Sequence, residues 1–151
     1  MSISRGRIGA VERRVFVDTS AYFAAVNRRD IHHEAVSRIM TQAVAARARL
    51  ITTNFVLAEL HALLLTRVNR QVAARVLAEI DTSELTTIVR VSAHDERRAR
   101  AIIFEYTDKD FSLTDATSFA VMERLRIRQA FTLDRNFSQF GWVLLDAGRE
   151  P

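Results

Sequence analysis

Short apolar runs alternate with longer amphipathic stretches along this chain of 151 residues. The short runs are β-branched or aromatic and predict strands at 15–17, 50–52, 87–91, 130–133 and 142–145. The stretches between them predict helices at 21–27, 31–49, 55–68, 70–80, 93–106 and 113–125. Because helices separate most successive strands, we expect an α/β fold, a three-layer α/β/α sandwich around a small, mostly parallel central sheet.

The length fits one domain, and no linker, repeat or low-complexity stretch divides the chain. We expect residues 14–148 to form that domain, preceded by an N-terminal extension, residues 1–13. The head of the chain is basic, because residues 1–14 hold Arg5, Arg7, Arg13 and Arg14 against Glu12. Two interpretations stay open, a basic arm for nucleic acid and a frayed terminus without a function.

Composition excludes several classes of protein. The chain has no cysteine, so a disulfide scaffold, a cysteine-ligated metal and a thiol nucleophile are excluded. No apolar run approaches the roughly 20 residues that span a bilayer, and residues 1–14 lack the apolar stretch of a signal peptide. We therefore expect a cytoplasmic protein that does not enter the membrane. Lys109 is the sole lysine, and no glycine-rich phosphate loop accompanies it.

Four carboxylates stand in unusual places. Asp18 and Asp134 each directly follow a predicted strand, where open α/β sheets bind ligands. Asp115 ends the pattern Ser112-Leu113-Thr114-Asp115, which is a helix-capping box. Glu59 lies between Phe55, Val56, Ala62 and Leu63 at helical spacing, so we expect it on the apolar stripe of its helix. Each has a structural alternative: a helix cap or turn for the three aspartates, and a partly exposed or arginine-paired position for Glu59.

Taken together, the four acids suggest a metal site. Four converging carboxylates repel one another unless a cation neutralises them. An all-oxygen site prefers hard ions such as Mg²⁺ or Mn²⁺, and such sites activate water for displacement at phosphorus.

The chain resembles a known family in four segments: Val15-Phe16-Val17-Asp18-Thr19-Ser20, Thr53-Asn54-Phe55-Val56-Leu57-Ala58-Glu59-Leu60, Phe111-Ser112-Leu113-Thr114-Asp115-Ala116 and Phe131-Thr132-Leu133-Asp134-Arg135-Asn136-Phe137. In order and spacing, over residues 14–146, they resemble the PIN-domain family, specifically the VapC-type toxins of bacterial toxin–antitoxin modules. The resemblance implies an α/β/α sandwich and an endoribonuclease dependent on Mg²⁺ or Mn²⁺ that cuts tRNA, rRNA or mRNA. It also implies a VapB-like antitoxin as partner and a homodimer.

The resemblance assigns roles to residues of this chain. Asp18 and Asp115 are expected as the principal metal ligands, and Glu59 and Asp134 as ligands directly or through water. Side chains expected to orient them by hydrogen bonds are Thr19, Ser20, Ser112 and Thr132. Arginines expected to hold RNA phosphates are Arg28, Arg29, Arg97, Arg98, Arg100 and Arg135.

Two other functions remain as alternatives at this point. A non-catalytic PIN-like module that binds RNA or protein would favour a degraded acidic set, whereas all four acids are present. A haloacid-dehalogenase-like phosphatase would require a second aspartate two residues after Asp18, where this chain has Ser20, and a downstream lysine, for which only Lys109 is available.

Overall fold

The computed structural model describes residues 14–144, so the expected extension 1–13 and the end of the expected domain, 145–148, lie outside the described residues. Its helices and strands follow in the order β1 (Arg14–Val17), α1 (Thr19–Val26), α2 (His33–Ala45), β2 (Arg49–Thr53), α3 (Asn54–Arg67), α4 (Arg70–Thr82), β3 (Thr86–Val89), α5 (Ala93–Glu105), α6 (Leu113–Leu125), β4 (Gln129–Phe131), α7 (Arg135–Phe140) and β5 (Val143–Leu144).

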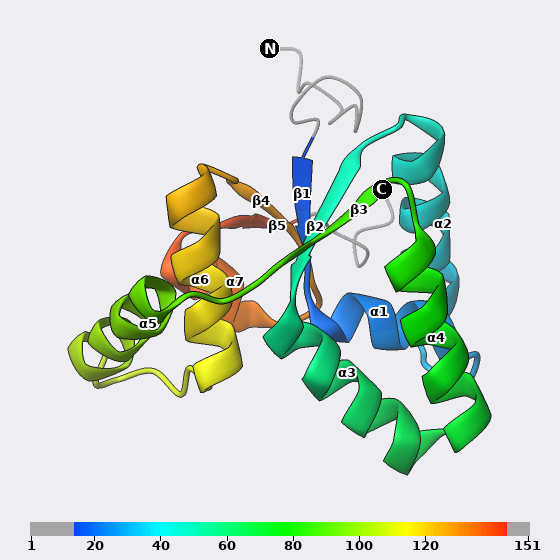
Figure 1. Ribbon diagram of the computed structural model, residues 1–151, viewed down its shortest axis with the longest axis horizontal. Coiled ribbons are helices and arrows are strands. Elements are labelled where there is room, and N and C mark those ends of the chain that lie inside the picture. Colours follow the sequence, from blue (N-terminus) through cyan, green and yellow to red (C-terminus); the bar gives the residue numbers. More distant parts are fainter. Residues whose placement is uncertain (1–13, 145–151) are drawn as a thin grey trace.

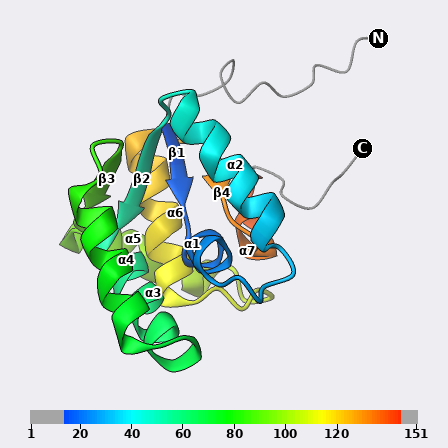
Figure 2. The same ribbon diagram turned by 90° about the vertical axis from the view of Figure 1, so that its right-hand side faces the viewer.

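These strands form one sheet in the order β3-β2-β1-β4-β5, and every pair is parallel. Helices α5, α6 and α7 lie on one side of the sheet, while α1, α2 and α4 lie on the other (Figure 1). The predicted α/β/α sandwich with a small parallel sheet is therefore confirmed. Figure 2 shows β1 and β2 running in the same direction, with α1 at their carboxyl end.

The central strand β1 is apolar on both faces because helices cover both. Val15, Phe16 and Val17 are all fully buried, as expected for a strand in the middle of a parallel sheet. An aromatic group fills the layer under α6 and α7, where the rings of Phe119 and Phe137 meet edge to face with centroids 4.9 Å apart. Phe137 also contacts Phe16 of β1, with ring centroids 6.2 Å apart, so this layer packs against the strand that precedes Asp18.

Three local details differ from the expected elements. Helix α2 ends at Ala45 and not at residue 49, because Arg47 adopts a left-handed backbone with φ 54°. Helix α3 begins at Asn54, one residue before the expected start, and Thr53 caps it by accepting a hydrogen bond from the Val56 N–H. The short helix α7 was not predicted at all. Within residues 14–144, no helix has both the length and the apolar character needed to cross a membrane.

Candidate active site

Asp18 lies at the carboxyl end of the central strand and is only 4% exposed. Burial raises the pKa of its carboxyl group to about 6, although a hydrogen bond from Thr132 opposes the rise, and the charge of Asp115 raises the pKa further. The neighbouring Thr19 is buried as well, but its hydroxyl has no hydrogen-bond partner among the described residues. Thr19 acts on Asp18 through its backbone, whose hydrogen bond opposes the rise in pKa that burial causes, and not through its hydroxyl.

Two hydroxyl groups do hold the Asp18 carboxylate. Its Oδ2 accepts hydrogen bonds from Ser20 Oγ at 3.1 Å and from Thr132 Oγ1 at 3.0 Å. The backbone fixes both hydroxyls in turn, because the Leu133 N–H donates to Ser20 Oγ and the Asp134 N–H donates to Thr132 Oγ1, each at 2.9 Å. The loop after β4 thus sets the orientation of the carboxylate at the end of β1.

Asp115 is positioned by the first turn of α6. Its Oδ2 accepts from the Ser112 N–H at 3.1 Å, while its own N–H donates to Ser112 Oγ at 3.0 Å, which completes the predicted capping box. Asn136 donates from Nδ2 to the same Oδ2 at 3.0 Å. Burial raises the pKa of Asp115 against the hydrogen bond from Asn136, and the charge of Asp134 adds to the rise.

Asp134 and Asn136 enter the site from the start of α7. Asp134 caps this helix, since its Oδ1 accepts from the Asn136 N–H at 2.9 Å. Sequence reasoning missed Asn136, whose partner Asp115 lies 21 residues earlier in the chain. The available signal was the position of Asn136 two residues after Asp134, which follows a predicted strand.

The three aspartates approach one another without a cation between them. Asp115 influences the pKa of Asp18, and Asp134 influences that of Asp115. None of the three forms an ion pair with Lys, Arg or His in the described part of the chain. Paired, partly dehydrated carboxylates of this kind fit a hard divalent cation, which would remove the repulsion between them.

Within residues 14–144, no group of three or more His, Cys, Asp or Glu side chains is arranged as a metal cage. Mg²⁺ is usually bound by one or two carboxylates and keeps several of its waters. Of the four acids expected as ligands, Asp18 and Asp115 are the two that are both buried and raised in pKa.

Glu59 does not lie where the sequence pattern predicted. Its side chain is exposed, and the buried face of α3 consists of other residues, namely Val56, Leu57, Leu60 and Leu64. The expectation of burial was wrong because α3 is apolar on nearly all sides, as the exposed Leu65 shows, so apolar neighbours do not identify the covered face. Glu59 is thus exposed on α3 and is not buried as Asp18 and Asp115 are.

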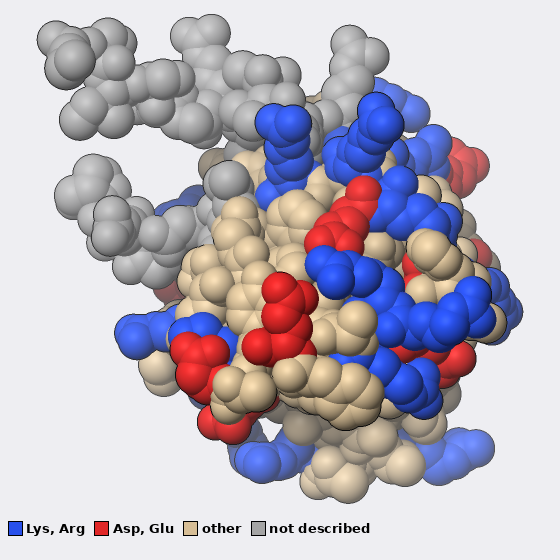
Figure 3. All heavy atoms as spheres, turned by 90° about the vertical axis from the view of Figure 1, so that its left-hand side faces the viewer, with Lys and Arg blue, Asp and Glu red and all other residues tan. Residues whose placement is uncertain are grey.

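The six arginines expected to bind RNA fall into three groups. Arg98 is engaged by Glu123 through two hydrogen bonds of 2.9 and 3.0 Å. Arg97, Arg100 and Arg135 are exposed, and Figure 3 shows Lys and Arg side chains gathered over one half of the face formed by α5, α6 and α7. Arg28 and Arg29, also exposed, follow α1 on the other side of the sheet.

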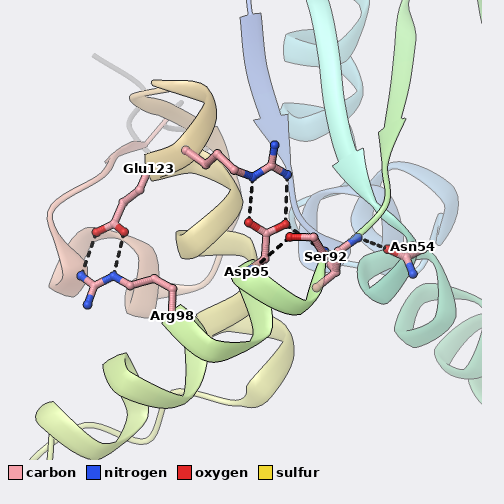
Figure 4. Close-up of polar contacts among 7 residues, drawn as sticks. Asn54, Ser92, Asp95, Arg98 and Glu123 are labelled. Atoms are coloured by element: carbon pink, nitrogen blue, oxygen red, sulfur yellow. Dashed lines mark hydrogen bonds and ion pairs between the residues drawn. The ribbon is translucent and has the colours of Figure 1, made fainter.

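Helix α6, which carries Asp115, is tied to α5 by an ion pair between the exposed Arg124 and the buried Asp95. Asp95 is fully buried and accepts from Arg124 at 2.8 and 2.9 Å, while its carboxylate also caps α5 together with Ser92 (Figure 4). Asn54, the first residue of α3, accepts from the Val91 N–H at 2.8 Å. These contacts link α5 to α6 and the start of α3 to the segment before α5.

Comparisons with known proteins cover nearly the whole described chain. A family model described as PIN domain matches residues 15–143. The 23S rRNA-specific endonuclease VapC20 of Mycobacterium tuberculosis is 33% identical over 132 residues, which cover 85% of this chain and 95% of that protein. Ribonuclease VapC26 of the same organism is 30% identical over 121 residues, covering 80% of this chain and 87% of its own.

Solved structures show the same likeness. The crystal structure of Mycobacterium tuberculosis VapC20, described as a sarcin-ricin loop cleaving toxin, matches with a TM-score of 0.78 at 33% identity and covers 85% of this chain and 96% of that one. The structure of FitAcB from Neisseria gonorrhoeae matches with a TM-score of 0.69 at 12% identity, covering 90% and 99% respectively. The second match supports the fold alone.

Proposed function

The chain belongs to the PIN-domain family as a VapC-type endoribonuclease toxin, and we propose that Asp18 and Asp115 hold the divalent metal ion with which it cuts RNA. The observation that carries this proposal is the pair of buried carboxylates, both with a raised pKa and neither with a cationic partner in residues 14–144. Such a pair is unfavourable in the free protein and becomes favourable when a cation binds.

Each remaining group of the site has a positioning task in this proposal. Ser20 and Thr132 fix the Asp18 carboxylate, and Asn136 fixes that of Asp115. Asp134, beside Asp115, and the exposed Glu59 act on the ion or its waters from further away. A bound Mg²⁺ or Mn²⁺ ion would lower the pKa of a water molecule for attack and stabilise negative charge at the scissile phosphate.

We propose ribosomal RNA as the substrate. The support is the 33% identity with VapC20, which is named as specific for 23S rRNA, over nearly the whole length of that protein. Transfer RNA and messenger RNA are the other substrates that the family resemblance allows. A substrate of this kind places the protein in the cytoplasm, and the toxin family implies a VapB-like antitoxin and a homodimer as its assemblies.

The test is cleavage of purified ribosomes and of total tRNA by the purified protein, with Mg²⁺, with Mn²⁺ and with EDTA. We expect cuts in ribosomal RNA that need the metal ion. Asp18→Asn and Asp115→Asn are expected to lower the cleavage rate at least 100-fold, because each removes a charged ligand. Asp110→Asn is the matched control, since Asp110 is exposed in the loop before α6 and lies outside the proposed site.

Different results separate the parts of the proposal. Cleavage that survives EDTA and both substitutions would contradict the metal site. Metal-dependent cleavage of tRNA but not of ribosomes would overturn the substrate and leave the site intact.

A further inference from the structure

A pocket of about 440 Å³ lies where α1, α3 and α4 meet, and four of its nine lining residues are arginines. Arg28 and Arg29 follow α1, Arg67 belongs to the last turn of α3, and Arg75 lies on α4. No lining residue is acidic. We call these four residues the arginine pocket. Arg28 and Arg29 are already expected from the sequence to hold RNA phosphates, whereas Arg67 and Arg75 join them only in the folded chain.

Most of the positive charge of the arginine pocket is not neutralised by ion pairs with other described residues. In residues 14–144 only Arg75 has an acidic partner, Glu79, at 3.6 Å, and both of those side chains are more than half exposed. Exposed pairs of this kind contribute little. The arginine pocket therefore concentrates positive charge in a concave site that lacks an internal counter-ion.

Helix dipoles explain only part of this arrangement. A cation in the last turn of a helix is favourable, which accounts for Arg67. Arg28 and Arg29 belong to no helix, and Arg75 lies beyond the first turn of α4, where the dipole has little effect. The first turn of α4 also has no acidic residue. An anion in the pocket would relieve the repulsion that the helices leave uncompensated.

The arginine pocket lies at the far ends of two helices that begin near the carboxyl ends of β1 and β2. Helix α1 begins directly after Asp18 and ends at the pocket, and its eight residues span about 12 Å. Helix α3 begins after β2, the strand next to β1, and also ends at the pocket. In Figure 1 both helices lead away from the lower end of the sheet toward α4. An RNA strand that crosses the aspartates along these helices would bring a further phosphate to the pocket.

We propose that the arginine pocket binds a phosphate group of the RNA substrate at a distance of a few nucleotides from the cleavage point. This inference rests on the proposed function, because it assumes that RNA enters the site. A phosphate is favoured over an acidic protein segment, because guanidinium groups match phosphate geometry with paired hydrogen bonds. The lining also has no aromatic residue of the kind that anchors protein interfaces.

The experiment measures binding of a labelled single-stranded RNA of mixed sequence by fluorescence anisotropy over a series of KCl concentrations. Asp115→Asn protein is used throughout so that the RNA stays uncut. We expect Arg28→Ala and Arg67→Ala each to weaken binding about threefold to tenfold. Each should also lower the slope of log K against log[KCl] by about 0.7, as expected for one lost phosphate contact on a single strand. Arg67→Lys should retain the slope.

The matched control is Arg38→Ala, which removes an exposed arginine of α2 outside the pocket and should change neither value. Equal thermal unfolding midpoints show that the variants are folded. The inference is wrong if the pocket variants bind RNA as tightly as Arg38→Ala does. It is also wrong if they bind RNA normally and lose only the binding of a poly-glutamate peptide, because that result would indicate a protein partner. Failure of the proposed function is recognised separately, by wild-type protein that does not cut RNA.

Discussion

A proton and a metal ion compete for the Asp18 carboxylate. The group is buried at the end of β1, and burial has raised its pKa to about 6, well above the ordinary value of 3.8. Metal ligands must be deprotonated, so binding of a metal ion has to displace any proton on Asp18. The pH at which this competition matters is therefore close to neutrality and not near 4.

We predict that Mn²⁺ affinity is nearly constant above pH 7 and falls about tenfold per pH unit below pH 6, because one proton must leave Asp18 for each ion bound. Isothermal titration calorimetry between pH 5 and 8 measures the affinity, and buffers of different ionisation enthalpy report the protons released. Asp134→Asn keeps Asp18 intact and should show the same pH midpoint. A midpoint near 4 in the wild-type protein would mean that Asp18 is not the competing group.

Substitution of Asn136 tests whether the orientation of the Asp115 carboxylate matters for metal binding. Its Nδ2 donates to Asp115 and lowers the pKa of that carboxyl group against the effect of burial. We predict that Asn136→Ala raises the pKa of Asp115 further and weakens Mn²⁺ binding about tenfold, as loss of an outer hydrogen bond does at other metal sites. The free energy of unfolding should fall by about 1 kcal/mol. A variant with reduced stability but unchanged metal affinity would make Asn136 a purely structural residue.

At the scale of elements, two arginine–carboxylate pairs join the α5–α6 region, and they differ in burial. Arg124 and Arg98 are each 38% exposed, but the Asp95 side chain is 1% exposed whereas that of Glu123 is 35% exposed. Burial alone would raise the pKa of Asp95, but hydrogen bonds from Arg124 and Ser92 outweigh it and leave the pKa below its usual value. Asp95 therefore stays charged in the interior as long as Arg124 is present.

We predict that Arg124→Ala lowers the free energy of unfolding at pH 7 by about 2–3 kcal/mol, because it leaves a buried carboxylate without its partner. Arg98→Ala removes the same charge from an exposed pair and should cost about 0.2–1 kcal/mol. Urea denaturation measures both. The contribution of Asp95 is present above its unfolded pKa and is lost as the pH falls through the lower, folded value. Equal losses of unfolding free energy in the two variants would show that the burial of Asp95 does not make its ion pair more important for stability.

How far the sequence predicts these elements depends on local chemistry. The bounds of α6 follow from the sequence because Ser112 and Asp115 form a capping box within the helix itself. Helix α7 escapes prediction because it is only six residues long and its cap, Asp134, is equally typical of a turn. The end of α2 depends on the backbone of Arg47, which no side-chain pattern reveals.

The residues of the candidate site also divide into those that the sequence predicts and those whose position depends on packing. Asp18, Asp115 and Asp134 are predictable because strand ends and a helix start converge at one edge of a parallel sheet. The exposure of Glu59 depends on which side of α3 the other helices cover, and this is a property of the packed molecule. The contact of Asn136 with Asp115 depends in the same way on how α7 packs beside α6.

At the scale of the whole molecule, the charge of the protein changes when the metal binds. The formal charge is +4, from 22 basic and 18 acidic residues. Four of those acids are the proposed site residues Asp18, Glu59, Asp115 and Asp134, so the rest of the chain has 22 basic residues against 14 acidic ones. A metal ion at the aspartates would therefore remove the main local repulsion that an RNA phosphate meets on an otherwise cationic protein.

The buried carboxylate of Asp18 should lower the free energy of unfolding of the metal-free protein. Because the pKa of Asp18 is higher in the folded state, its contribution to stability is full below pH 3.8 and is lost as the pH rises through about 6. The shift corresponds to about 3 kcal/mol at pH 8. We predict that Asp18→Asn, which can still accept from Ser20 and Thr132, raises the free energy of unfolding at pH 8 by up to this amount while abolishing cleavage.

Chemical denaturation at pH 4 and pH 8, with and without Mg²⁺, measures this trade-off. The advantage of Asp18→Asn should vanish at pH 4, where the wild-type carboxyl group is largely protonated. Mg²⁺ at 100 times its dissociation constant should stabilise the wild-type protein by about 2.7 kcal/mol and leave the variant unchanged. Asp110→Asn should stay within about 0.5 kcal/mol of the wild type throughout. If Asp18→Asn is destabilising at pH 8 without metal, the carboxylate supports the fold, and stability has not been given up for metal binding.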